Sequence, residues 1–237
     1  MSENSTISCY DNHTRLYDTY QFAVVPGYRE MLDLVAEAAA RYLPQQPKIL
    51  DLGCGTGNAS MSILREMPTA SILLLDGSEK MVCAAKDKLS HSNPGAILGS
   101  RVADLTKENW AEELDREGYD CIVSTLVLEH LPFDRYKAVI RECFRLLKPG
   151  GWLFSSEGYS EEGSDMQAWF FQEMEKRRLK LDPRLSDFVA QLRNEKEVHY
   201  YTTKAKKMEW WEHAGFLHVN VTWQYLCLAL MVGKKEI

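Results

Sequence analysis

The chain has 237 residues, of which 45% are hydrophobic, so it can bury a sizeable core as one large domain. Its formal net charge of −6 and sequence pI of about 5.6 argue against an unaided electrostatic grip on nucleic acid. No stretch approaches the roughly twenty apolar residues of a membrane span, and the first residues lack the features of a signal peptide. The six cysteines include no C-x-x-C pair, so we expect reduced thiols, no metal site and a cytoplasmic location.

The first part of the chain predicts two helices with a break between them. A short helix is expected over residues 13–22, and Pro26-Gly27 interrupts the chain after it. A longer amphipathic helix is expected over residues 28–43, because apolar side chains recur there at steps of three and four residues. Pro44 ends this helix.

Residues 48–58, KILDLGCGTGN, predict a buried strand, a sharp turn and the start of a helix. Gly53, Gly55 and Gly57 let the backbone bend and come close to a ligand, because a Cβ at these positions would clash. The helix that follows would present free backbone N–H groups and the positive end of its dipole to that ligand. Asp51 ends the strand, where its carboxylate would complement an ammonium group of the ligand.

The next strand, over residues 71–75, ends in a second acid. Asp76 lies about twenty residues beyond the glycines, where nucleotide-binding folds place the acid that binds ribose hydroxyls. Asn58 occupies the position of the third glycine in a dinucleotide fingerprint, which argues against a nicotinamide dehydrogenase. No lysine followed by Ser or Thr succeeds the glycines, so a P-loop is excluded. Ser78 is expected to cap the next helix, which carries Met81 on its apolar face.

Beyond this helix the alternation of strands and helices continues, as in a doubly wound α/β fold. The third strand ends in RVADL, in which Asp104 and Leu105 follow the strand directly. The expected elements are, in order, that strand near residue 101, a helix over 106–114, a fourth strand over 121–124, a helix over 134–147 capped by Asp134, and a fifth strand over 152–156.

Residues 157–203 interrupt the alternation with an aromatic-rich segment. Its expected elements are a helix over 165–180, a helix over 185–192 and an extended piece over 198–202. An insertion between the fifth and sixth strands lies at the ligand edge of such a sheet and commonly forms a lid. The alternative is an extra helical layer that completes the core. The elements expected after the insertion are a helix over 205–214 and two tightly joined strands over 216–223 and 225–232.

Several of these stretches resemble one family. The glycine segment is similar to the first motif, D-x-G-x-G-x-G, of the class I S-adenosylmethionine-dependent methyltransferases, and the DGSEKM, STLVLEHLP and LKPGG segments also resemble that family. The resemblance implies an α/β fold with a doubly wound, mostly parallel seven-stranded sheet, a reversed last strand and helices on both faces. It implies a single domain over residues 1–237, in which residues 1–28 cover the cofactor and residues 157–203 form a helical substrate lid.

The resemblance also implies that S-adenosyl-L-methionine (SAM) binds along the carboxyl edge of the sheet. Tyr17 and Tyr20 would contact it, or else pack the first helix onto the sheet. Met81 would flank the adenosine or belong to the core, and Asp104 would meet the adenine or cap the next helix. The expected cofactor-binding residues are Tyr17, Tyr20, Asp51, Gly53, Cys54, Gly55, Gly57, Asp76, Gly77, Met81, Asp104, Leu105, Thr125 and Leu126.

The sulfonium of SAM makes its methyl carbon electrophilic, so the enzyme mainly has to align a nucleophile and exclude water. An amine acceptor would need a nearby base or carboxylate, and a thiol or phenol would need help in losing its proton. His130, after the fourth strand, and Glu157, past the fifth, are the expected catalytic residues; the alternatives are a helix-start residue and a surface acid. Further candidates near the expected mouth are Glu129, Tyr159, His199, Tyr200 and Tyr201.

SAM-dependent methyl transfer is the leading hypothesis. The acidic chain and the aromatic insertion favour a small-molecule acceptor over nucleic acid, and we expect no membrane association and a monomer or homodimer. One alternative is a carboxy-S-adenosylmethionine synthase, because VPGYR (residues 25–29) and WQY (residues 223–225) resemble such enzymes, although these typically depart from three clean glycines. A nicotinamide dehydrogenase and a non-catalytic, cofactor-binding regulator are two further hypotheses.

Overall fold

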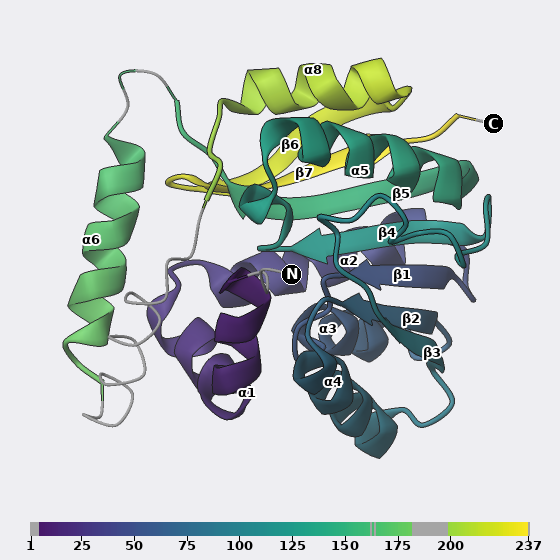
Figure 1. The fold of residues 1–237 in the computed structure, drawn as a ribbon, viewed down its shortest axis with the longest axis horizontal. Helices are drawn as coiled ribbons and strands as arrows, with labels where there is room; N and C mark the ends of the chain where they lie inside the picture. Colours follow the sequence, from purple (N-terminus) through teal and green to yellow (C-terminus); the bar gives the residue numbers. More distant parts are fainter. Residues whose placement is uncertain (1–4, 162, 164, 182–198, 237) are drawn as a thin grey trace.

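The structure, a computed structural model, describes residues 5–161, 163, 165–181 and 199–236. Within these residues a seven-stranded sheet has the order β3-β2-β1-β4-β5-β7-β6 (Figure 1). Its strands are β1 (Lys48–Leu52), β2 (Ser71–Asp76), β3 (Ile97–Val102), β4 (Tyr119–Thr125), β5 (Leu147–Gly158), β6 (Leu217–Tyr225) and β7 (Leu228–Lys234).

The sheet is parallel from β3 through β5 and then reverses. β1 pairs in parallel with β2 on one side and with β4 on the other, and β7 lies antiparallel between β5 and β6. This topology confirms the predicted doubly wound sheet with a reversed last strand. Strand order changes direction between β1 and β4, and open α/β sheets hold their ligands at the carboxyl edge of such a switch point.

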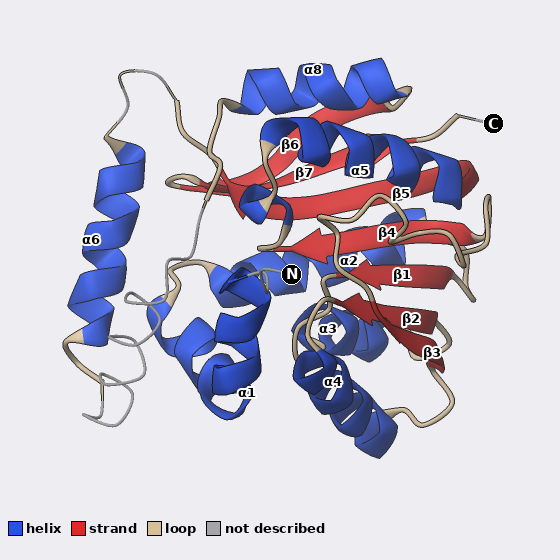
Figure 2. Ribbon diagram, in the orientation of Figure 1, coloured by secondary structure: helices blue, strands red, loops and turns tan. Residues whose placement is uncertain are grey.

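Helices cover both faces of the sheet (Figure 2). Each face is joined to its helices by a separate cluster of buried apolar side chains. One cluster includes α2 (Tyr28–Tyr42), α3 (Asn58–Glu66) and α4 (Glu79–Ser92), and the other includes α5 (Phe133–Leu146) and α8 (Lys204–Ala214). The cysteines whose side chains the structure describes are free thiols, and four of the five are buried.

Two further helices lie outside these layers. Helix α1 (Ser5–Val24) is longer than the predicted helix over residues 13–22 and lies near the carboxyl ends of β1 and β4 (Figure 1). Helix α6 (Met166–Arg178), predicted over residues 165–180, stands farther out and contacts α1. No helix in the described part of the chain is both long enough and apolar enough to cross a bilayer.

The helix predicted over residues 106–114 is wrong, because this segment forms a succession of turns. Asp104 accepts hydrogen bonds from the backbone N–H of Thr106 (2.8 Å) and from its hydroxyl (2.7 Å), which closes a local turn. The guanidinium of Arg135 donates to the carbonyls of Leu105 and Lys107, two acceptors that a helix would use for its own ladder. Tertiary hydrogen bonds thus override the helical pattern here.

Two smaller predictions, the cap of α5 and the start of β5, differ from the structure. Asp134 does not cap α5: the helix begins at Phe133 after Pro132, no side chain caps it, and Asp134 pairs with Lys137 at 3.0 Å. Strand β5 starts at Leu147 rather than at residue 152. The helix predicted over residues 185–192 lies outside the described residues, and the expected extended piece is described only from residue 199, with no regular secondary structure there.

A buried ion pair joins α8 to β5. The ammonium of Lys207 contacts the carboxylate of Glu157, and neither side chain is more than 1% exposed. Glu157 also accepts hydrogen bonds from the hydroxyls of Tyr136 (3.0 Å) and Ser155 (2.8 Å), and the Trp211 indole donates to Tyr136 (2.9 Å). Because burying two charges is costly, such a pair is tolerated only when its remaining hydrogen bonds are made, as they are here.

Lys207→Met should destabilise the fold by about 3–5 kcal/mol, because it leaves the Glu157 carboxylate buried without its counter-charge. The free energy of unfolding in urea measures the effect, and exposed Lys206→Met on the same helix is the control, expected within roughly 0.5 kcal/mol of the wild type. The double variant with Glu157→Gln should lose less stability than Lys207→Met alone. A single variant as stable as the Lys206 control would contradict the prediction.

Candidate functional site

The turn after β1 folds over the end of β2. Its three glycines have φ of +74° (Gly53), +50° (Gly55) and +82° (Gly57), a region that favours glycine. The N–H groups of Gly53 and Cys54 donate to the Leu75 carbonyl at 2.7 and 2.9 Å, and the Gly57 N–H donates to Cys54 at 2.8 Å. These N–H groups shape the loop itself.

The loop lies between the turn after β4 and helix α1. A Cβ on Gly53 would lie 2.4 Å from Cγ2 of Val127, so this position has no room for a side chain. A Cβ on Gly55 would lie 3.7 Å from Cε1 of Tyr17, which is an ordinary contact. The Tyr17 ring therefore lies next to the middle glycine, and the half-buried Tyr20 is on the same helix.

Both predicted acids are in place at the ends of β1 and β2. Asp51 is fully buried; one oxygen accepts a hydrogen bond from the Ser60 hydroxyl, and Oδ1 has no partner in the described structure. Burial raises the pKa of Asp51 to about 7, and the Asp76 charge adds to the rise. Asp76 accepts the N–H groups of Gly55 and Ser78, both at 2.9 Å, through different oxygens.

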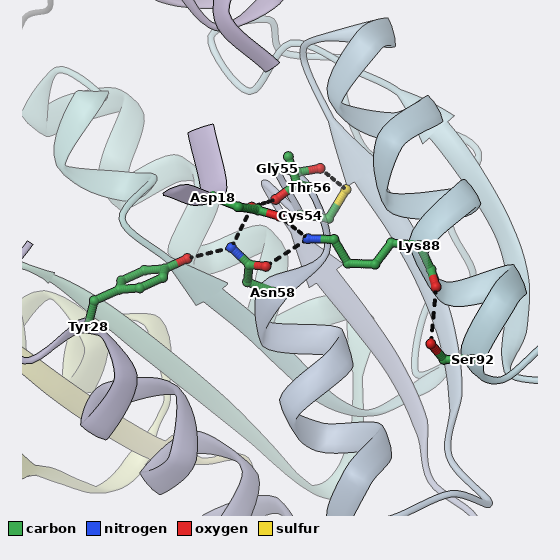
Figure 3. Close-up of polar contacts among 8 residues, drawn as sticks. All are labelled: Asp18, Tyr28, Cys54, Gly55, Thr56, Asn58, Lys88 and Ser92. Atoms are coloured by element: carbon green, nitrogen blue, oxygen red, sulfur yellow. Dashed lines mark hydrogen bonds and ion pairs between the residues drawn. The ribbon is translucent and has the colours of Figure 1, made fainter. Parts of the chain in front are cut away.

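A hydrogen-bonded group that we name the Asp18 network connects α1, α2, α3 and α4 beside the loop (Figure 3). Asp18 accepts hydrogen bonds from the Thr56 hydroxyl and from Asn58 (2.9 Å), and pairs with Lys88 at 2.6 Å. Asn58 also donates to the Tyr28 hydroxyl (3.1 Å) and accepts from Lys88 (2.8 Å). Asn58, noted in the sequence only as a departure from a dinucleotide fingerprint, thus holds α1 beside the glycine loop.

The turn after β4 contains a strained residue. Leu126 has φ of +57°, which costs of order 1–3 kcal/mol for a bulky side chain. Its N–H donates to the Ser156 carbonyl at 2.7 Å, which ties the turn to β5 just beyond Thr125. Strain of this kind concentrates where backbone geometry serves a ligand.

The remaining expected cofactor residues have varied surroundings. Met81 is buried in the first turn of α4, and its N–H donates to the Ser78 hydroxyl at 3.1 Å, which confirms the predicted cap. Gly77 is half-buried and lies between Asp76 and the capping Ser78. Burial raises the pKa of the Cys54 thiol well above its usual range. Asp104 holds its own turn, and the buried Leu105 belongs to the cluster under α5.

The two expected catalytic residues have different surroundings. His130 lies in the short 3-10 helix η1 (Leu128–His130), with its ring 4.5 Å from the ring of His199, which in turn stacks on Tyr201 at 5.2 Å. Glu157 is held in the ion pair with Lys207, so its surroundings fix it in position. Neighbouring Glu129 is 3% exposed, and its Oε2 has no partner among the described residues.

The two segments that resemble carboxy-S-adenosylmethionine synthases contact each other. A Cβ on Gly27, whose φ is +76°, would lie 3.0 Å from the Trp223 ring and 3.2 Å from Cβ of Tyr225. Phe22 meets Tyr28 edge-on at 5.1 Å on the other side of this break. The break between α1 and α2 thus packs on β6, near its turn into β7.

Comparison with known proteins decides the family. Residues 49–151 match a family model described as a methyltransferase domain. These residues form a methyltransferase domain. The match includes β1 to β4 with the glycine loop and the turn after β4, and it agrees with the predicted methyltransferase domain.

Similar proteins extend the likeness beyond the matched domain. A carboxy-S-adenosyl-L-methionine synthase of Shewanella amazonensis is 30% identical over 146 residues, 61% of this chain and 58% of that protein. The synthase of Chromohalobacter salexigens is 27% identical over 217 residues, 90% of this chain and 77% of that protein. The methyltransferase domain thus lies in a chain that spans less than two thirds of the first relative.

A solved structure shares the fold of the methyltransferase domain. Human N-acetylserotonin methyltransferase in complex with SAM superposes with a TM-score of 0.65 at 16% identity, covering 100% of this chain and 60% of that one. At this identity the likeness concerns the fold alone.

Gly53→Ala should destabilise the domain more than Gly55→Ala. Both add left-handed strain of about 1 kcal/mol, but only the Cβ at position 53 enters the Val127 side chain, which adds roughly 1–3 kcal/mol of overpacking. Urea unfolding measures both losses. Combining Gly53→Ala with Val127→Ala should recover part of the extra loss, and equal losses in the two single variants would contradict the geometry.

Stability should also depend on the protonation of Asp51. Its pKa of about 7 in the folded state exceeds the ordinary value of 3.8, so between these values the folded state keeps a proton that the unfolded chain has lost. The contribution of Asp51 to stability therefore falls as pH rises through this window, by at most about 1.4 kcal/mol per pH unit. Asp51→Asn should flatten the pH dependence of the unfolding free energy, whereas exposed Asp87→Asn should not. Identical slopes in both variants would refute the prediction.

Proposed function

We propose that this chain transfers the methyl group of SAM to a nucleophilic atom of a small-molecule acceptor. The observation that carries the proposal is the unpartnered Oδ1 of Asp51, a buried acidic atom at the end of β1 beside the glycine loop. A buried carboxylate oxygen left without a donor is costly, and a cationic ligand compensates that cost. SAM carries two cationic groups, and when bound it supplies an electrophilic methyl group.

Different residues of the chain would bind different parts of this cofactor. Asp51 would face its ammonium group, and Asp76, held by the N–H groups of Gly55 and Ser78, would accept the ribose hydroxyls. Tyr17, beside Gly55, would cover the loop from α1. The remaining expected cofactor residues keep their proposed roles around the adenosine and the sulfonium end.

We assign the expected catalytic residues different roles. His130 stays a candidate base at the mouth, next to the ring of His199. Glu157 has both oxygens engaged inside the fold, which favours a positioning role for the turn after β5 over direct proton transfer. Both roles are proposals.

The acceptor proposal rests on charge and on the surroundings of the edge. The chain is acidic, and α6 and residues 199–203 lie beside the carboxyl edge with aromatic side chains among them. A hollow of about 230 Å³, including its open mouth, lies between β5, α6 and the β6–β7 turn. In this proposal residues 1–28 cover the cofactor and residues 157–203 form the substrate lid. We also propose that the protein is a single-domain monomer or homodimer and that it is located in the cytoplasm.

A carboxy-S-adenosylmethionine synthase is the second candidate. Two relatives that cover 61% and 90% of this chain carry that name. The VPGYR and WQY segments, which resemble such enzymes, also pack on each other. The loop keeps all three glycines, which argues against this candidate because such synthases typically depart from that pattern.

Calorimetry with S-adenosylhomocysteine, the demethylated cofactor, tests the binding site. The wild type should bind it in the micromolar range, and Asp76→Ala should weaken binding by at least about tenfold through loss of charge-assisted hydrogen bonds. Asp87→Ala is the matched surface control, and the unfolding free energy of each variant checks the fold. A wild-type protein that binds neither S-adenosylhomocysteine nor SAM would defeat the proposal.

Mass spectrometry of the ligand that stays bound through purification separates the two candidates. We expect SAM or S-adenosylhomocysteine. The mass of a carboxylated sulfonium, lost in Asp76→Ala, would overturn methyl transfer in favour of the synthase.

A further inference from the structure

A second group of buried polar atoms without partners lies where β4 and β5 end. Glu129, Ser156 and Tyr159 are at most 3% exposed, and Oε2, Oγ and the phenol oxygen of these residues have no hydrogen-bond partner in the described chain. Most buried polar groups in proteins are hydrogen-bonded. Three exceptions within two adjacent strand ends indicate that a ligand, rather than the protein, completes their hydrogen bonds.

The group lies between the glycine loop and the hollow. Val127, two residues before Glu129, packs against Gly53 of the loop. Tyr159 lines the hollow together with Cys227, and its N–H donates to the Cys227 carbonyl at 2.8 Å. Burial raises the pKa of Cys227 to about 11, and the Glu129 charge adds to the rise.

Among the described groups that face Glu129, no cation is left to pair with its carboxylate. From β5 and α8 it meets Glu157 and Lys207, which neutralise each other in their ion pair. From its own turn it meets His130, and its backbone carbonyl accepts the N–H of Tyr200 at 2.6 Å. Burial raises the pKa of Glu129 to about 7, with a further contribution from Glu157.

Aromatic side chains gather on the two segments that meet at Glu129, residues 130–133 and 199–201. The rings of His130, His199 and Tyr201 form a row, and Phe133 meets Tyr200 edge-on at 6.1 Å. A buried carboxylate attracts ammonium groups and repels carboxylates and phosphates, and nearby aromatic faces also favour cations. Neutral hydroxyl acceptors gain less from such a site.

We propose that the acceptor is an amine and that Glu129 binds its nitrogen and removes its proton, with Ser156 and Tyr159 as the neighbouring polar groups. The proposal rests on methyl transfer as the proposed function. An ammonium group that reaches these three side chains pairs with the Glu129 carboxylate, and its proton moves to Oε2. The freed nitrogen lone pair forms the N–CH₃ bond, while the S–CH₃ bond breaks and leaves its electron pair on sulfur. The proton then leaves Glu129 for solvent.

A binding experiment tests the proposal without turnover. Protein loaded with S-adenosylhomocysteine is titrated with benzylamine, 2-phenylethylamine and cyclohexylmethylamine, and with the alcohols of the same skeletons. At least one amine should bind about tenfold more tightly than its alcohol, because a carboxylate distinguishes the charged partner. Near pH 6 its binding should release close to one proton, counted in buffers of different ionisation enthalpy, and near pH 8 almost none.

Glu129→Gln should abolish the amine preference and the proton release, and it should leave S-adenosylhomocysteine affinity within about twofold. Glu112→Gln, an exposed acid in the segment between β3 and β4, is the control and should keep both. Methyl transfer to the same panel, extended by thiols, should reach amines only and should fall at least about tenfold in kcat in Glu129→Gln. No amine preference anywhere in the panel, a preference that survives Glu129→Gln, or transfer to alcohols or thiols alone would overturn the amine proposal. If the wild-type protein does not bind S-adenosylhomocysteine, the proposed function itself is wrong.

Discussion

The burial of acidic groups is the constraint on which the carboxyl edge of this sheet depends. Glu157 shows how the fold neutralises such a group: Lys207 supplies the opposite charge, and two hydroxyls occupy the other oxygen. Asp51 and Glu129 are as deeply buried, yet each keeps an oxygen without a partner in the described residues. The fold thus gives Glu157 a full set of partners, whereas Asp51 at the end of β1 and Glu129 after β4 each keep one oxygen without a partner in the described residues. The difference marks these two positions as places for ligands rather than for core packing.

The glycine loop gains its shape from the same edge. Its N–H groups bond to Leu75, Asp76 and Cys54, so the loop is rigid before any ligand arrives. Glycine is required because Val127 stands against Gly53 and because three positive φ angles follow one another. The Asp18 network then attaches α1 to this rigid loop. Its ion pair is partly exposed, so it contributes far less than the apolar packing of α2 and α3, and α1 is the more weakly attached cover.

Local patterns explain which parts of the fold could be predicted. The strand, glycine turn and helix from Lys48 onward, the cap at Ser78 and the two tightly joined last strands follow from short-range spacing and agree with the structure. The reversal of the last strand followed from the family resemblance, and it agrees as well. The segment over residues 106–114 does not, because its apolar spacing fits a helix while Arg135, far along the chain, binds two of its carbonyls. The contact of Asp18 with Lys88 and the lack of a partner on Glu129 are long-range properties. Sequence spacing named Glu129 only as one acid among several near the mouth.

The proton explains how two unpartnered acids are tolerated. An ionised carboxylate without a partner in a buried position is expensive, whereas its protonated form is much less so. Burial brings the pKa of both Asp51 and Glu129 to about 7, so each can hold a proton near neutral pH at small cost. A cationic ligand then replaces that proton. On the proposed function this exchange occurs twice along one edge, at Asp51 for the donor and at Glu129 for the acceptor. Two cations facing each other would repel in the absence of these charges, and the ionised acids remove that repulsion when both sites fill.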